Sequence, residues 1–178
     1  MRRIHIFGAS GSGTTTLGRA LASRLQCSHF DSDDYYWLPT APPFQQSRER
    51  HSRQKLLLRD LKDADAWVLS GSLCGWGDVA VELFDLAVFL WIPHDLRMSR
   101  LEAREMERYG RETVRPGGVW RSETQEFLDW AAGYDTAGVE VRSRALHEVW
   151  MASLPCPVVR LEGDFSLSDR VERIMEMH

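Results

Sequence analysis

The chain has 178 residues, of which 43% are hydrophobic and 27% are charged, and its formal net charge at pH 7 is −4. These values are typical of one globular domain, exclude a disordered chain, and argue against a general nucleic-acid binder, which usually has a basic surface. No apolar run is long enough to span a bilayer, and Met1-Arg2-Arg3 leads into a strand rather than a signal peptide. We therefore expect a single cytoplasmic domain over 1–178, with no nucleic-acid or membrane partner and an oligomeric state that the sequence leaves open.

Cysteine and basic residues narrow the chemistry further. The three cysteines, Cys27, Cys74 and Cys156, are widely spaced and form no zinc or redox motif, so we expect them to be reduced. Lys55 and Lys62 are the only lysines in the sequence. Contacts to phosphate or carboxylate groups therefore depend on arginine, whose planar guanidinium suits bidentate binding.

The first half of the chain alternates predicted strands with helices. A short buried strand is expected at 3–7, and a glycine-rich loop then leads into a helix near 14–25, where apolar residues recur at helical spacing. A second strand is expected at about 28–31, and the prolines in 35–44 predict an aromatic loop rather than a helix. The next elements are a polar helix at 46–63 and a third strand at 67–70.

The second half continues the alternation. The nearly continuous apolar run 85–92 is typical of a strand covered on both faces of a sheet, and Pro93 ends it. The remaining predicted elements are helices at 95–108, 122–133, 140–153 and 167–177, with a last strand at 157–161. Such alternation predicts parallel strands joined by right-handed crossovers, and hence a three-layer α/β/α sandwich.

Ligands of such sheets bind outside the carboxyl ends of the strands. The glycine-rich loop, an acidic cluster, Ser70-Gly71-Ser72 and Pro93-His94 each follow a predicted strand. We therefore expect these four segments to line one edge of the sheet.

The segment from Gly8 to Thr16 resembles a phosphate-binding loop. Gly8 and Gly13 have the spacing of the motif G-x-x-x-x-G-K-[ST], and Thr15 stands at the hydroxyl position that helps to bind Mg²⁺. Backbone N–H groups and the positive end of the following helix dipole then hold phosphate. The alternative is a glycine-rich turn without a ligand. The residues expected to bind the nucleotide are Gly8, Ser10, Gly11, Ser12, Gly13, Thr14, Thr15 and Thr16.

Thr14 departs from the motif because it replaces the lysine. Loss of one donor to the transferring group costs on the order of 2.7–4 kcal/mol of transition-state stabilisation. Either an arginine elsewhere supplies the charge, or the protein binds nucleotide and turns over slowly. Candidate arginines recur at steps of three, four and four on one predicted helix face, the alternative being a solvated face that nearby glutamates compensate. They are Arg97, Arg100, Arg104 and Arg108.

The acidic cluster supplies candidate metal and base groups. Asp31 and Asp33 are two residues apart after a strand, so an extended backbone would point both carboxylates the same way. Asp31 would bind Mg²⁺ through water, and Asp33 would accept a proton from an acceptor hydroxyl. The alternative for both is a structural or surface role.

Other residues leave a functional and a structural role open. Tyr36 and its aromatic neighbours would stack on a planar substrate or close the core. Gly71 and Ser72 would contact the acceptor or form a turn. The tryptophans Trp120, Trp130 and Trp150 favour packing in the core or in a lid, and the histidines have no metal-ligand spacing.

On these motifs, the chain resembles the nucleoside-monophosphate kinase and shikimate kinase group of P-loop proteins. Within it, the chain is most similar to bacterial adenylate kinase-like, or AAA-family ATPase, proteins. The resemblance implies a parallel sheet with strand order 2-3-1-4-5, Mg-ATP as phosphoryl donor and a mobile lid near 104–118. It also implies that Asp31 and Asp33 hold the metal and the acceptor hydroxyl. The lid arginines would be Arg104, Arg108 and Arg111, and Arg97 would contribute to substrate binding.

These observations predict a kinase that transfers the γ-phosphoryl group of Mg-ATP to a nucleoside monophosphate or a hydroxylated metabolite. Asp33, Arg104 and Arg108 are the predicted catalytic residues. Thr14 keeps two alternatives open: a catalytically weak nucleotide-binding regulatory module, and an NTPase that needs no acceptor.

Overall fold

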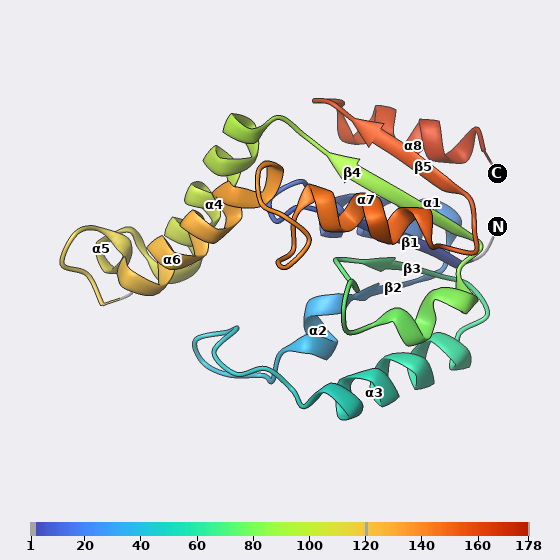
Figure 1. Ribbon diagram of the computed structural model, residues 1–178, viewed down its shortest axis with the longest axis horizontal. Helices are drawn as coiled ribbons and strands as arrows, with labels where there is room; N and C mark the ends of the chain where they lie inside the picture. The colour runs from blue at the N-terminus through green and yellow to red at the C-terminus, as the bar shows by residue number, and fades with distance from the viewer. Residues whose placement is uncertain (1–2, 120, 178) are drawn as a thin grey trace.

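The computed structural model describes residues 3–119 and 121–177 and contains a five-stranded sheet with helices on both faces (Figure 1). Neighbouring strands pair in parallel, in the order β2-β3-β1-β4-β5. This confirms the predicted fold class and strand order. The strands are β1 (Arg3–Gly8), β2 (Ser28–Asp31), β3 (Trp67–Ser70), β4 (Leu86–Trp91) and β5 (Val158–Glu162).

Alternation along the strands divides the core into two layers. Ile4 and Ile6 of β1 face the apolar residues of α1 (Thr14–Leu25) and α8 (Leu167–Met175). Phe7 points to the opposite face, which α3 (Arg50–Asp63) and α7 (Arg144–Ala152) cover. Each fully buried side chain of this size contributes about 1.5–3 kcal/mol, so both faces hold the helices firmly.

Three helices extend beyond the carboxyl ends of the strands (Figure 1). They are α4 (His94–Tyr109), α5 (Arg111–Val114) and α6 (Arg121–Ala132), and Leu101, Leu128 and Ala131 form a small core between α4 and α6. The predicted lid at 104–118 corresponds to the end of α4, to α5 and to the turn after it. Its closure stays a prediction.

The short helix α2 (Ser32–Tyr36) differs from the prediction of an extended acidic cluster followed by an aromatic loop. Asp31 ends β2 and caps α2, because its Oδ1 accepts a hydrogen bond of 3.1 Å from the backbone N–H of Asp33. Tyr35 and Tyr36 therefore belong to a helix, and the irregular loop begins at Trp37.

Caps also explain where two predicted helices actually begin. Glu49 accepts hydrogen bonds from the backbone N–H groups of His51 and Ser52, so α3 starts four residues later than expected. Ser143 accepts one from Leu146 and sets the start of α7. The helix α5 and two 3-10 helices, Asp78–Leu83 and Gly133–Asp135, were not predicted.

No helix in the described part of the chain has the length and apolar character needed to cross a membrane. Trp150 lies in the core, as one of its two predicted roles requires. Trp130 is partly exposed, and the prediction for Trp120 lies outside the described residues.

Candidate active site

The glycine-rich loop connects β1 to α1 and adopts a backbone that few side chains tolerate. Gly11 and Gly13 have φ values of 84° and 95°. A Cβ on Gly11 would lie 2.8 Å from Cγ of Leu101 and 2.9 Å from the carbonyl oxygen of Arg97. The loop is therefore packed tightly on α4. No side chain caps α1, so its first backbone N–H groups have no helical partner and suit an anion.

A cavity of about 940 Å³ lies over this loop. Most of the residues predicted to bind nucleotide line it, namely Gly8, Ser10, Gly11, Gly13, Thr14, Thr15 and Thr16. Ser12 does not, because its side chain is buried and donates a 2.8 Å hydrogen bond to the Ala9 carbonyl. Ser12 braces the loop from inside. We call this space the donor cavity.

Thr15 and Asp31 meet at the floor of the donor cavity. The Thr15 hydroxyl donates to Oδ2 of Asp31 at 2.6 Å, and the Ser70 hydroxyl donates to the same oxygen at 3.1 Å. Hydroxyl and carboxylate oxygens are ligands that suit Mg²⁺. The described residues contain no group of three or more His, Cys, Asp or Glu side chains that would hold a metal alone. A Mg²⁺ ion here would thus complete its shell with water and phosphate oxygens.

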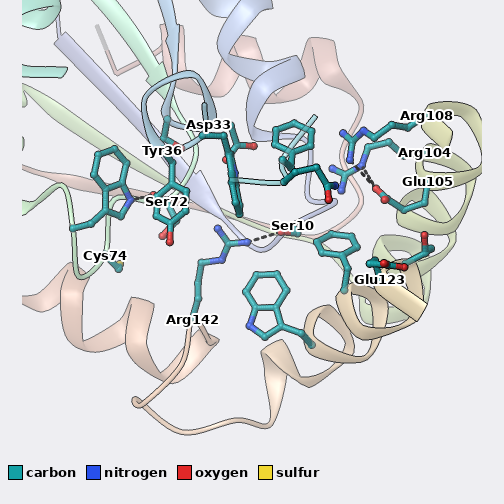
Figure 2. A pocket seen from close by; sticks show the side chains of 18 of the residues that line it. Ser10, Asp33, Tyr36, Ser72, Cys74, Arg104, Glu105, Arg108, Glu123 and Arg142 are labelled. Atoms are coloured by element: carbon teal, nitrogen blue, oxygen red, sulfur yellow. Dashed lines mark hydrogen bonds and ion pairs between the residues drawn. The ribbon is translucent and has the colours of Figure 1, made fainter. Parts of the chain in front are cut away.

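A second cavity, of about 620 Å³, lies beside the donor cavity (Figure 2). It lies between α2 and the part of the molecule formed by α4 to α6, which we call the α4–α6 arm. We call this second cavity the acceptor cavity. Its walls combine aromatic rings with charged groups. The aromatic residues that line it are Tyr36, Trp37, Phe44, Trp76, Tyr109, Phe127 and Trp130.

The two cavities share a wall of charged residues. Asp33, Arg104, Arg108 and Arg142 line both cavities, and their side chains point into the space between the elements in Figure 2. A group bound in one cavity would therefore meet a group bound in the other at these four side chains.

The carboxyl group of Asp33 is suited to hold a proton. The side chain is exposed to the cavities, but the surrounding protein partly desolvates it and thereby raises its pKa above the usual value of 3.8, and the nearby charge of Asp31 raises the pKa further. Arg142 and Arg104 act in the opposite direction. The result is a carboxylate that accepts a proton more readily than an exposed aspartate does.

Comparison with known proteins agrees with this architecture. A family model described as an AAA domain, AAA_18, matches residues 4–129. The chain belongs to the AAA_18 family.

Relatives of this AAA_18 chain include an uncharacterized protein, YqaC, from Bacillus subtilis, which is 53% identical over 98% of this chain and 96% of its own. A cytidylate kinase from Haloarcula marismortui is 28% identical over 71% of each chain. Shikimate kinase from Acinetobacter baumannii has a similar fold, with a TM-score of 0.59, 18% identity, and coverage of 99% of this chain and 92% of the other. The predicted resemblance to the P-loop kinase group is thus confirmed.

Glu105 holds two of the predicted catalytic arginines of this AAA_18 chain. Its side chain is only 4% exposed, and Oε1 accepts from Nε of Arg104 at 3.2 Å and from Nη1 of Arg108 at 2.9 Å. Burial lowers the pKa of Arg104, and the neighbouring charge of Arg108 lowers it further. The shared carboxylate thus keeps both guanidinium groups at the wall between the cavities.

Sequence reasoning missed Arg142 and Arg53. Arg142 precedes α7, donates to the Ser10 hydroxyl at 2.6 Å and lies 4.6 Å from the centre of the Trp130 ring. Arg53 of α3 lines the acceptor cavity and lies 4.0 Å from the centre of the Tyr36 ring. Neither belongs to a motif or a stripe, so no signal in the sequence distinguishes them from other arginines.

Two predicted substrate-binding arginines, Arg97 and Arg111, lie away from both cavities. Arg97 is fully buried and donates to the carbonyl of Ala131 at 2.7 Å and to Asp135 at 3.3 Å. The buried residues of α4 are Arg97, Leu101 and Glu105. Arg97 therefore lies on the face of α4 that points to the protein interior. Arg111 is exposed on α5 and borders neither cavity.

The other predicted substrate contacts do line the cavities. Tyr36 borders the acceptor cavity, Gly71 borders the donor cavity and Ser72 borders both. Asp31 borders the donor cavity. The Ser72 hydroxyl also lies 3.0 Å from Nε2 of the buried His147, so its position is fixed from behind.

Proposed function

We propose that this protein is a kinase that transfers the γ-phosphoryl group of Mg-ATP to a hydroxyl group of a small anionic acceptor. The observation that carries this proposal is the wall of Asp33, Arg104, Arg108 and Arg142 between the two cavities. Phosphoryl transfer needs mainly positioning and neutralisation of charge, and this wall offers both. The kinase names of one relative and of the structural neighbour support the same class.

The donor cavity would hold the nucleotide. The loop from Gly8 to Thr16 would bind the phosphates through backbone N–H groups, and Thr15 with Asp31 would hold Mg²⁺. When bound, the metal neutralises negative charge on the phosphate oxygens.

Asp33 would act as general base on the acceptor. The acceptor oxygen forms a bond to the γ-phosphorus while the bond from that phosphorus to the bridging oxygen of ADP breaks. The hydroxyl proton passes to Asp33, and ADP leaves with the bonding electron pair. Arg104 and Arg108 would stabilise the charge on the phosphoryl oxygens.

A hydroxyl acceptor is favoured over a nucleoside monophosphate by the position of Asp33. A phosphate monoester is largely ionised at pH 7, so it needs no base, and a carboxylate beside it would repel it. An alcohol, in contrast, must lose a proton. Arg53 lines only the acceptor cavity and has a buried Nε without a partner among the described residues, which favours an anionic group on the acceptor.

The test is ADP formation with three sets of acceptors: hydroxylated carboxylic acids, nucleoside monophosphates, and none. We expect turnover with a hydroxylated acid, and Asp33→Asn should lower kcat by about 10²- to 10⁴-fold without weakening Mg-ATP binding. Faster turnover with a monophosphate would overturn the assigned acceptor class.

A second candidate function is a regulatory nucleotide-binding module, which the threonine at position 14 favours. It predicts nucleotide binding with negligible turnover in every arm of the same experiment. ADP formation that does not depend on any acceptor would instead indicate an NTPase.

A further inference from the structure

Thr14 leaves the phosphate loop without the positive side chain of the motif. The arginines that line the donor cavity differ in whether a carboxylate already pairs with them. Arg100 pairs with Asp164 at 3.5 Å. Arg104 and Arg108 share Glu105. Each of these three cations therefore has a carboxylate partner before any nucleotide binds.

Two other arginines line the donor cavity but are less suited to the transferred group. Arg170 donates to the main-chain carbonyls of Ser12 at 3.3 Å and Gly163 at 3.5 Å, and it does not line the acceptor cavity. Arg19 is exposed on α1 and also lines only the donor cavity. Neither lies at the wall that both substrates would share.

Among the described arginines at the donor cavity, Arg142 is the one that both lines the acceptor cavity and lacks an ion-pair partner. It lines both cavities, and its Nη2 donates to Ser10 of the phosphate loop at 2.6 Å. Among the described residues, no carboxylate lies within 4.0 Å of its guanidinium group, and its buried Nε has no hydrogen-bond partner. A cation that has no ion-pair partner and is partly shielded from solvent binds an anion more strongly than an exposed cation does, because less solvent competes.

Its surroundings keep this side chain in place. The ring of Trp130 lies 4.6 Å from the guanidinium carbon. The adjacent Ser143 is fully buried, and its hydroxyl donates to the carbonyl of Gly138 at 2.6 Å, which fixes the backbone that presents Arg142. Burial lowers the pKa of Arg142 although the charge of Asp33 acts in the opposite direction, so an anion bound beside the guanidinium group would replace interactions that burial removes.

We propose that Arg142 supplies to the γ-phosphoryl group the positive charge that the lysine of the phosphate loop would supply at position 14. The charge reaches the loop from the segment before α7. With Thr14 in place of lysine, the positive charge is then supplied from a different part of the chain and is not lost. The catalytic part of this inference rests on the proposed kinase function. The binding part does not, because the γ-phosphate of a non-hydrolysable nucleotide would meet the same guanidinium group.

The experiment measures, by titration calorimetry in Mg²⁺, how much more tightly each variant binds a non-hydrolysable ATP analogue than ADP. Arg142→Ala is expected to reduce this preference about ten- to hundredfold, as loss of a charged hydrogen bond does. Adding Thr14→Lys to Arg142→Ala should restore most of it, whereas Thr14→Lys alone should change it little. Arg24→Ala, which removes an exposed arginine at the end of α1, is the matched control.

An unchanged preference in Arg142→Ala overturns the inference, as does a folded double variant without restoration. If Thr14→Lys prevents folding, as judged by circular dichroism, Arg142→Lys and Arg142→Met decide instead. A charge role requires the lysine variant to keep most of the preference and the methionine variant to lose it. Failure of the wild type to phosphorylate any acceptor overturns the kinase function, but leaves this binding result able to decide the role of Arg142.

Discussion

Asp33 is the residue in which the local structure and the proposed chemistry are most closely linked. It lies in the first turn of α2, beside Asp31. Together with Arg104 and Arg142 it forms part of the wall between the cavities, and the charges of these two arginines act on it. Partial desolvation by the surrounding protein and the neighbouring carboxylate raise its pKa, so its protonation state responds to pH above the usual aspartate range.

The pH dependence of activity follows from this shift. Asp33 must be ionised to accept a proton, so kcat/KM should fall as pH decreases through the pKa of Asp33. Because that pKa lies above 3.8, the acid limb should lie at higher pH than for an ordinary aspartate. Asp34→Asn removes a like charge outside the proposed metal site, so it should move the limb to lower pH. A limb that stays at the same pH in this variant would contradict the assignment.

At the residue scale, the sequence revealed the candidate groups that belong to patterns. Asp33 follows a strand, and Arg104 and Arg108 repeat on a helix, so chain position alone indicated them. Arg142 lies just before α7, and Arg53 lies in α3. Only the packing of the whole chain brings these two residues to the cavities. Arg97 matched the pattern, but the rotation of α4 buried it.

The elements at the carboxyl edge are held together by a close contact between the turn after β3 and the start of α2. Gly71 has a φ of 96°, and a Cβ there would lie 1.9 Å from Oγ of Ser32 and 3.0 Å from its Cβ. Only glycine permits this approach, and the approach fixes α2, which contains Asp33.

Gly71→Ala should therefore destabilise the protein by more than the approximately 1–2 kcal/mol that a left-handed backbone costs a non-glycine residue. Gly75 is the matched control: its φ is 76°, and an added Cβ would meet nothing within 4 Å. Gly75→Ala should thus show the backbone cost alone. Urea denaturation measures both free energies of unfolding, and equal losses in the two variants would contradict the role of the contact.

The strands were predicted well, and the short helices were not. Each strand was predicted to within about a residue of its observed ends, and β3 and β4 are compact apolar runs, as is typical of covered parallel strands. The five residues of α2 are too few to show a helical period, and nothing in the sequence indicated that Asp31 caps a helix.

At the scale of the whole molecule, the parallel sheet brings four chain segments to one edge, as the alternation of elements predicted. The division of that edge into two cavities was not predictable. It depends on how the α4–α6 arm meets the loop that follows α2, where Arg108 lies 4.5 Å from the centre of the Phe44 ring. Side-chain contacts between segments so far apart leave no pattern in a single sequence.

Nucleotide binding should stabilise the whole domain. A ligand at 100 times its Kd adds about 2.7 kcal/mol to the free energy of unfolding if it binds only the folded state. Mg-ATP should thus raise the melting temperature, and removal of the metal with EDTA should reverse part of the rise. Thr15→Val, which removes the hydroxyl bound to Asp31, should abolish the EDTA-sensitive part. Mg²⁺ alone is the control, and a rise unaffected by EDTA would contradict a metal at this site.

The carboxylate of Glu105 is an anion that already pairs with two arginines of the candidate site. It occupies the donors of Arg104 and Arg108, so an incoming phosphate must compete with a group that is already well placed. A small free anion such as inorganic phosphate would have to displace Glu105 from the arginines, and it would make few other contacts to offset that cost. We expect a nucleotide to offset this cost through its other contacts. The carboxylate that orders the two arginines should therefore also favour a nucleotide over small free anions at this site.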